Sequence, residues 1–197
     1  HRAPAGTQDP YIYEDADDLE LLIETPGYPK GFINRLTQWD FPEPENIGQV
    51  ISFAQGANPR LGIKMNSSID NDQINLNVEA LFAEDFQNLK LVVYVLENGL
   101  IYPQVNYTPY YNGENPIENY VHDHTLRKTL TNILGDEINT SQTRTGNTYS
   151  REFSFEIPQE IENTDEIEFV AFLTDPQGNV VNVRKSILDE NQEFEIL

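Results

Sequence analysis

Apolar and polar residues alternate with a period of two along much of the chain after residue 60. Residues 73–82, QINLNVEALF, carry apolar side chains at every second position, which is typical of a β-strand with one face in water. Residues 89–96, LKLVVYVL, are apolar at almost every position, as in a central strand covered on both sides. The change of period indicates that a β-rich domain begins near residue 59.

Turn signals separate the remaining strand candidates. Asn98-Gly99 is a strong hairpin signal, so residues 100–102 are expected to pair back onto the strand before them. Further strands are predicted at residues 120–126, 149–157, 166–174 and 180–187. A short helix is expected only within residues 126–134, which is too little for the crossovers of a parallel sheet. The prediction is a mostly β protein with an antiparallel, immunoglobulin-like β-sandwich.

The N-terminal part of the chain follows a different pattern. Residues 25–31, TPGYPKG, form a dense turn signal, and residues 32–35 are a short strand candidate. Residues 45–54 carry apolar side chains at helical spacing, with acidic residues at the start. We therefore expect a small α/β region over residues 1–58 and the β-sandwich domain over residues 59–197.

Charge and cysteine content exclude several functions. The chain has 12 Lys and Arg against 33 Asp and Glu, a net charge of −21, which repels phosphate backbones and argues against nucleic-acid binding. It contains no cysteine, so disulfides, thiol catalysis and Cys-based zinc sites are excluded within this chain. No apolar stretch reaches the length of a membrane span. Any export signal or lipid anchor is expected upstream of His1.

Two groups of residues are candidates for metal binding. His122 and His124 stand at positions i and i+2, which project from the same face of a strand, and Asp136 or Glu137 could add a third ligand. The alternative is that the two histidines hydrogen-bond to the backbone or to carboxylates and hold a strand crossing. Metal binding is the less favoured interpretation.

Asp70-Asn71-Asp72 gathers oxygen ligands of the kind that calcium prefers. The segment lacks the further spaced acids and the glycine of an EF-hand loop, so a turn rich in Asx residues is favoured for Asp70 and Asp72.

A long connection at residues 103–119 is the best candidate for partner binding. It contains Tyr107, Tyr110 and Tyr111 among several asparagines, a mixture that suits adaptable binding surfaces. The alternative is that these tyrosines pack over the end of the sandwich. No Gly-x-Ser-x-Gly elbow and no phosphate-binding glycine loop is present, so neither an enzyme nor a cofactor is predicted.

Several segments together resemble a known family. They are residues 26–35 (PGYPKGFINR), residues 91–99 (LVVYVLENG), Gln104, residues 120–127 (YVHDHTLR) and residues 169–175 (FVAFLTD). They resemble the outer-membrane-protein-28-related lipoproteins of Gram-negative envelopes. That family shows a "YPxGxxNR" stretch, a strand ending in Glu, a Gln shortly after it, and a "Y-x-H-N/D-H-x-L-R" block.

The resemblance implies an exported lipoprotein with a thioredoxin-like region followed by a β-sandwich. Residues 1–58 would be the back half of the thioredoxin-like unit. Pro29 would occupy the place of that fold's cis-proline, with a cis bond between Tyr28 and Pro29. Family members often carry a Cys pair at the start of this unit, and its absence here leaves a redox role without support.

The leading functional hypothesis is a non-catalytic lipoprotein of the outer membrane, at the cell surface or on the periplasmic face. It would act as a binding or assembly subunit of an envelope complex. Expected partners are envelope or outer-membrane proteins, with glycans as a further class, and membrane contact only through an upstream lipid anchor. The alternatives are a thiol-disulfide oxidoreductase-like protein whose cysteine half lies outside this chain, and a metal-dependent adhesion module.

Overall fold

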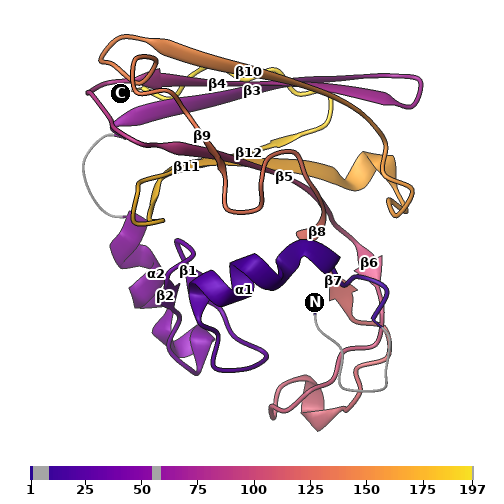
Figure 1. Ribbon diagram of the computed structural model, residues 1–197. Coiled ribbons are helices and arrows are strands. Elements are labelled where there is room, and N and C mark those ends of the chain that lie inside the picture. Colours follow the sequence, from indigo (N-terminus) through magenta and orange to yellow (C-terminus); the bar gives the residue numbers. More distant parts are fainter. Residues whose placement is uncertain (2–8, 55–58, 197) are drawn as a thin grey trace.

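Two antiparallel sheets face each other as the layers of a sandwich, and the N-terminal helices lie beyond the outer face of one of them (Figure 1). The structure is a computed structural model that describes His1, residues 9–54 and residues 59–196. The predicted mostly β, antiparallel fold class is confirmed. No helix of the described ranges is long and apolar enough to cross a membrane.

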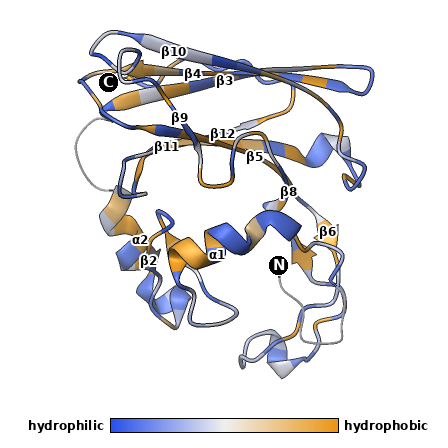
Figure 2. Ribbon diagram, in the orientation of Figure 1, coloured by the Kyte–Doolittle hydropathy of each residue, from blue (hydrophilic) through white to orange (hydrophobic). Residues whose placement is uncertain are grey.

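The first sheet has three strands in the order β10-β4-β3. They are β3 (Leu61–Asp70), β4 (Gln73–Phe82) and β10 (Thr148–Glu156). A tight turn joins β3 to β4, and Asn71 occupies it with a φ of 55°, a conformation that Asn tolerates better than most residues. Hydrophobic and hydrophilic positions alternate along these strands (Figure 2), so each strand buries one face.

The second sheet has the order β12-β11-β5-β8, and β9 also pairs with β5. Its strands are β5 (Lys90–Glu97), β8 (Thr125–Thr129), β9 (Asp136–Glu137), β11 (Ile167–Thr174) and β12 (Val180–Ile187). β5 lies in the middle and is buried on both faces, because Val93 points into the core while Val92 and Leu96 are buried on the other side. The prediction of a central strand is confirmed.

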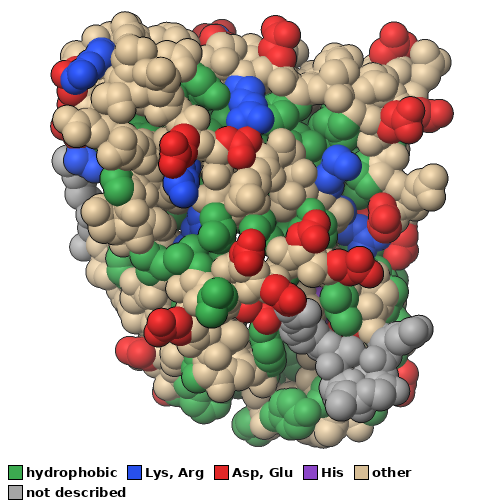
Figure 3. All heavy atoms as spheres, viewed as in Figure 1, with side chains coloured by type: hydrophobic (Ala, Val, Ile, Leu, Met, Phe, Trp, Pro, Cys, Tyr) green, Lys and Arg blue, Asp and Glu red, His purple; other side chains and the backbone are tan. Residues whose placement is uncertain are grey.

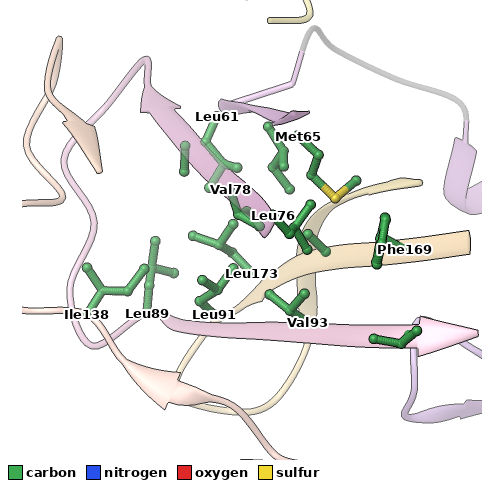
Figure 4. Close-up of a cluster of buried hydrophobic side chains, with 14 of the residues drawn as sticks. Leu61, Met65, Leu76, Val78, Leu89, Leu91, Val93, Ile138, Phe169 and Leu173 are labelled. Carbon is green, nitrogen blue, oxygen red and sulfur yellow. The ribbon is translucent and has the colours of Figure 1, made fainter. Parts of the chain in front are cut away.

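The space between the two layers is filled by aliphatic and aromatic side chains from both sheets. Leu61, Met65 and Leu76 of the first sheet meet Val93 and Phe169 of the second (Figure 4). These side chains are fully buried or nearly so. Each contributes about 1.5–3 kcal/mol by leaving water, so this contact is the main source of stability of the sandwich.

The expected hairpin at Asn98-Gly99 is wrong. β6 (Leu100–Ile101) pairs with β7 (Val121–His122) and leaves β5 altogether. The reason is that both edges of β5 are already occupied at this end, since Glu97 faces β8 on one side and β11 on the other. The chain therefore passes through Asn98-Gly99 and moves away from the sheet.

The helix expected within residues 126–134 is also absent. Residues 125–129 are β8, which pairs with β5, and the next residues form turns that lead into β9. Pairing with the long apolar strand β5 outweighs the local helical tendency of this segment. β3, over residues 61–70, was not recognised as a separate strand from the sequence.

The described part of residues 1–58 contains two short α-helices, each preceded by a 3₁₀ turn, and one small hairpin. The elements are η1 (Glu14–Ala16), α1 (Asp17–Ile23), β1 (Phe32–Ile33), β2 (Thr37–Gln38), η2 (Glu43–Asn46) and α2 (Ile47–Ala54). The helix predicted from the apolar spacing of residues 45–54 is confirmed as α2. β1 and β2 pair only with each other, so the thioredoxin-like interpretation of this region stays a prediction.

A buried ion pair joins two neighbouring strands of the second sheet, β5 and β8, to a nearby loop. Glu97 is fully buried at the end of β5, and its Oε1 accepts hydrogen bonds of 2.7 Å from the backbone N–H groups of Glu162 and Asn163. Its Oε2 lies 3.1 Å from Nε of Arg127 on β8, without the alignment of a hydrogen bond. Arg127 also donates to the carbonyl oxygen of Glu160.

The N-terminal segment is attached at the same place. Tyr11 is buried, lies with its ring 5.4 Å from the Arg127 guanidinium, and places its hydroxyl 3.2 Å from Glu162 Oε1. Two residues further on, the Tyr13 hydroxyl accepts a hydrogen bond of 3.3 Å from the backbone N–H of Thr129 on β8. The ion pair therefore lies under the segment that fixes the N-terminal region to the sandwich.

We expect the variant Glu97→Gln to lower the free energy of unfolding by about 3 kcal/mol, because it leaves the buried Arg127 charge without a counter-charge. Urea unfolding followed by circular dichroism measures the change. The exposed Glu166→Gln variant removes the same charge a short distance away and serves as the control. Equal stabilities of the two variants would contradict this role of the ion pair.

We expect Gly135→Ala to destabilise the protein by about 1–3 kcal/mol. Gly135 has a φ of +100°, and a Cβ at this position would lie 2.9 Å from the side chains of Lys90 and Val92. Gly48 lies exposed in α2 with open space around it, so Gly48→Ala should keep or raise stability. Thermal unfolding of both variants tests the prediction, and a Gly135→Ala protein as stable as the parent contradicts it.

Candidate functional site

The predicted binding loop leaves the sandwich between β6 and β7 and returns through a narrow neck. Backbone hydrogen bonds close this neck, since Gln104 N donates to Ile117 O over 3.0 Å and Ile117 N donates back over 2.9 Å. One step below, Tyr102 N donates to Tyr120 O. Residues 103–119 thus form a compact loop that extends beyond the end of the sandwich (Figure 1).

Asn106 holds this loop in one conformation. Its side-chain amide donates to the carbonyl oxygens of Tyr110 and Glu114, both over 2.9 Å. Its side-chain oxygen accepts from both the backbone N–H and the hydroxyl of Thr108. The backbone N–H of Asn106 in turn donates to the side chain of Asn115. The loop is therefore organised by its own polar groups rather than by burial of apolar side chains.

The three tyrosines that the sequence singled out all lie exposed on this loop. Tyr107 is 75% exposed, Tyr111 57% and Tyr110 45%. The alternative, in which these tyrosines pack over the end of the sandwich, would bury the side chains, and this is not observed. The chain has no Lys or Arg between residues 91 and 126, while Glu114 and Glu118 lie in the loop. The surface offered is aromatic, rich in amides and weakly acidic.

An aromatic cluster lies behind the loop. The rings of Tyr111 and Tyr120 are 5.9 Å apart, and the ring of Tyr120 lies 4.8 Å from His122. His122 in turn contacts Tyr11 of the N-terminal segment at 5.8 Å. Burial, followed by the neighbouring Tyr111, raises the pKa of Tyr120, and burial together with Glu162 raises that of Tyr11. Both phenols are therefore neutral at physiological pH and pack as uncharged rings.

The two histidines of the proposed metal pair do not face each other. His122 is buried and its Nε2 donates to the carbonyl oxygen of Tyr102 at 3.1 Å. His124 has a φ of 55° in the turn before β8, and its Nδ1 lies 3.2 Å from Glu168. The expectation that both project from one strand face is wrong, because the strand ends at His122.

The remaining metal candidates do not form a ligand cage either. Asp70 ends β3 and accepts a hydrogen bond from the side chain of Asn71, and Asp72 lies beside Asn71 in the β3–β4 turn. Asp136 is paired with Arg151 at 2.6 Å. Within the described ranges, no three His, Asp or Glu side chains are grouped so that they could hold a metal ion.

The Tyr28–Pro29 peptide bond is cis, at the position where the sequence placed a cis-proline. Tyr28 is 55% exposed on the turn before β1. This chain contains no cysteine, so it supplies no thiol that could face Pro29. The bonds before Pro42 and Pro116 are cis as well, which sequence reasoning did not predict.

The sequence also gave no indication of an acidic hollow beside α1. It has a volume of about 490 Å³ and is lined by Glu14, Asp15, Asp17 and Asp18 together with Thr129, Thr131, Asn132 and Ile133. Figure 3 shows Lys and Arg side chains mainly over the sandwich, with acidic and apolar side chains on the N-terminal region below it. The hollow is open and strongly negative.

Comparisons with known proteins identify a family and a similar fold for this chain. The family model described as outer membrane protein Omp28 matches residues 16–192. A solved structure, HBP35 of Porphyromonas gingivalis, superposes with a TM-score of 0.68 at 17% sequence identity, covering 88% of this chain and 57% of that one. At this identity the superposition supports the fold alone, and this chain spans little more than half of the HBP35 structure. No curated protein matches the sequence.

Several of the residues that carry the resemblance noted in the sequence have structural roles at the end of the sandwich where the loop 103–119 leaves it. Glu97 and Arg127 form the buried pair, Gln104 closes the neck of the loop, and Tyr120 and His122 form the aromatic cluster behind it. The match over residues 16–192, which includes most of the chain, shows that the protein belongs to the outer membrane protein Omp28 family.

Proposed function

We propose that this protein is a non-catalytic binding or assembly subunit of a cell-envelope complex and that it contacts a partner protein through the loop 103–119. The observation that carries the proposal is the exposure of Tyr107, Tyr110 and Tyr111 on a loop held by its own hydrogen bonds. The family gives the protein a location at the outer membrane or in the envelope, where such partners are present.

Preorganisation supports this use of the loop. Tyrosine supplies a large contact area with few rotatable bonds, so binding through it costs little conformational entropy. A loop whose backbone is already ordered adds little further cost on association. The absence of Lys and Arg between residues 91 and 126 favours a partner surface that is neutral or basic, because an acidic partner would be repelled by the net charge of −21.

Two other functions have less support. A metal-dependent adhesion module would need ligands that converge, and His122, His124 and Asp70 each contact a different group. A thiol-disulfide role would depend on cysteines outside this chain, and its support among the described residues is the cis bond before Pro29.

The triple variant Tyr107→Ala/Tyr110→Ala/Tyr111→Ala should lose at least tenfold in capture of the partner from detergent-solubilised envelopes, because truncation of an interface tyrosine that acts as a hot spot costs about 2 kcal/mol. Its unfolding temperature should match that of the parent, since all three side chains are exposed. Quantitative pull-down with mass spectrometry measures the captured partner.

The matched control is Leu21→Ala/Phe41→Ala/Ile47→Ala, which removes three equally exposed apolar side chains from the N-terminal region. It should retain capture. If both triple variants capture the partner equally well, the loop is not the binding surface. If the parent protein binds isolated envelope polysaccharide and the tyrosine variant does not, the partner is a glycan and not a protein.

We expect Asn106→Ala to weaken partner capture several-fold without changing global stability, because the loop loses four hydrogen bonds to the Asn106 side chain and must then be ordered on binding. Hydrogen–deuterium exchange should become faster across residues 106–115. The exposed loop variant Glu118→Ala is the control. Unchanged exchange in Asn106→Ala would contradict the role of Asn106 as the organiser of the loop.

A further inference from the structure

One edge of the sandwich lacks a hydrogen-bonding partner among the described residues. β10 pairs with β4 on one side and lies at the margin of its sheet on the other (Figure 1). Ile157 N donates to Asp72 O, just beyond the end of β10. This bond shows that the odd-numbered residues of β10 direct their N–H and C=O groups toward β4. In an antiparallel ladder the intervening residues direct their N–H and C=O groups outward, so residues 148, 150, 152, 154 and 156 face the open edge.

The opposite edge of the same sheet is covered by the chain's own C-terminal segment. Ser67 N donates to Glu190 O, Met65 N donates to the side chain of Gln192, and Gln192 N donates back to Met65 O. Ile63 N is satisfied by the side chain of Glu195. Residues 189–195 thus complete the ladder along β3, and no described segment does the same for β10.

The open edge also lacks most features that keep strand edges from pairing. Residues 148–156, TYSREFSFE, contain no Pro or Gly, and their register with β4 runs without a bulge. The one inward charge, Arg151, is neutralised by Asp136 at 2.6 Å. Phe153 and Phe155 pack against the core but are only half-buried. A long, regular and partly apolar edge of this kind favours pairing with another strand.

The sequence of β10 selects the partner strand and its register. Two copies of β10 related by a two-fold axis overlap best when the axis passes through Arg151, Glu152 or Phe153. The first register places Arg151 opposite Arg151 and the second places Glu152 opposite Glu152, which brings like charges together. In the third, Phe153 faces Phe153, Glu152 faces Ser154, and Arg151 faces Phe155, so no like charges meet.

We propose that two copies of this chain associate through antiparallel pairing of β10 with β10, about a two-fold axis at Phe153. The two three-stranded sheets then become one continuous sheet across the dimer. The outward N–H and C=O groups of residues 150–156 are satisfied, and the half-buried Phe153 and Phe155 side chains are covered by Phe153 and Arg151 of the second copy. This interface does not include the loop 103–119, so its failure leaves the proposed binding function untouched.

A charge exchange at Ser154 tests the register. Ser154 is exposed and faces Glu152 of the second copy in the proposed dimer, twice by symmetry. Ser154→Glu should raise the dimer dissociation constant about tenfold, and Ser154→Lys should lower it, because like charges opposite each other destabilise strand pairs and opposite charges stabilise them. Sedimentation velocity over a range of protein concentrations measures the constant.

Substitutions at Ser68 control for the effect of net charge. Ser68 is exposed on β3 of the same sheet, away from the open edge. Ser68→Glu and Ser68→Lys therefore change the net charge by the same amounts as the corresponding substitutions at Ser154. They should leave the dissociation constant within about twofold of the parent. Equal shifts at Ser154 and Ser68, or a parent protein that stays monomeric at millimolar concentration, would overturn the proposal.

Cross-linking tests the same register without relying on affinity. Because the chain contains no cysteine, Glu152→Cys mixed with Ser154→Cys should form a mixed disulfide under mild oxidation. Directly opposed residues lie about 5.5 Å apart between Cα atoms, within reach of a disulfide. In either variant alone the two Cys positions are offset by two residues, so their Cα atoms lie about 8–9 Å apart, which is too far for a disulfide. Cross-linking of the single variants with none in the mixture would overturn the register.

Discussion

Two opposite charges are buried together at the end of β5, where Glu97 meets Arg127, and the surrounding elements are arranged around them. The carboxylate accepts from the loop at residues 162–163, and the guanidinium reaches Glu160 and lies against Tyr11. A buried charge is tolerated only when it is paired and hydrogen-bonded. Four segments distant in the sequence must therefore come together for the sandwich end to form.

The Glu97–Arg127 pair also lies next to the strands that position the candidate binding surface. β6 and β7 leave the second sheet directly beyond Glu97, and their short ladder carries the loop 103–119 away from the sandwich. The ring chain from Tyr111 through Tyr120 and His122 to Tyr11 connects that loop with the N-terminal segment. The exposed tyrosines thus stand on a rigid support even though the loop buries few apolar groups of its own, as adaptable binding loops on stable scaffolds commonly do.

The edges of the sandwich receive unequal protection. The C-terminal segment satisfies β3 with a series of backbone and side-chain acceptors, and Tyr13 contributes a hydroxyl to β8. β10 has a regular hydrogen-bonding edge and half-buried aromatic side chains without comparable cover among the described residues. The exposed tyrosine loop at one end of the sandwich and the open edge of β10 are two separate surfaces, and the two proposals of partner binding and self-association rest on them independently.

Patterns in the amino-acid order were enough to predict the mostly β class, most of the long strands, helix α2 and the tyrosine-rich loop, because period-two alternation and helical spacing are local signals that burial enforces. It could not determine pairing. The Asn98-Gly99 signal suggested a hairpin, but β8 and β11 occupy both edges of β5. The spacing of His122 and His124 likewise predicted that both lie on one face of a strand. In the structure the turn at His124 separates them. The Glu97–Arg127 contact and the open edge of β10 were decided only by tertiary structure, since they depend on which segments compete for the same strand and the same buried charge.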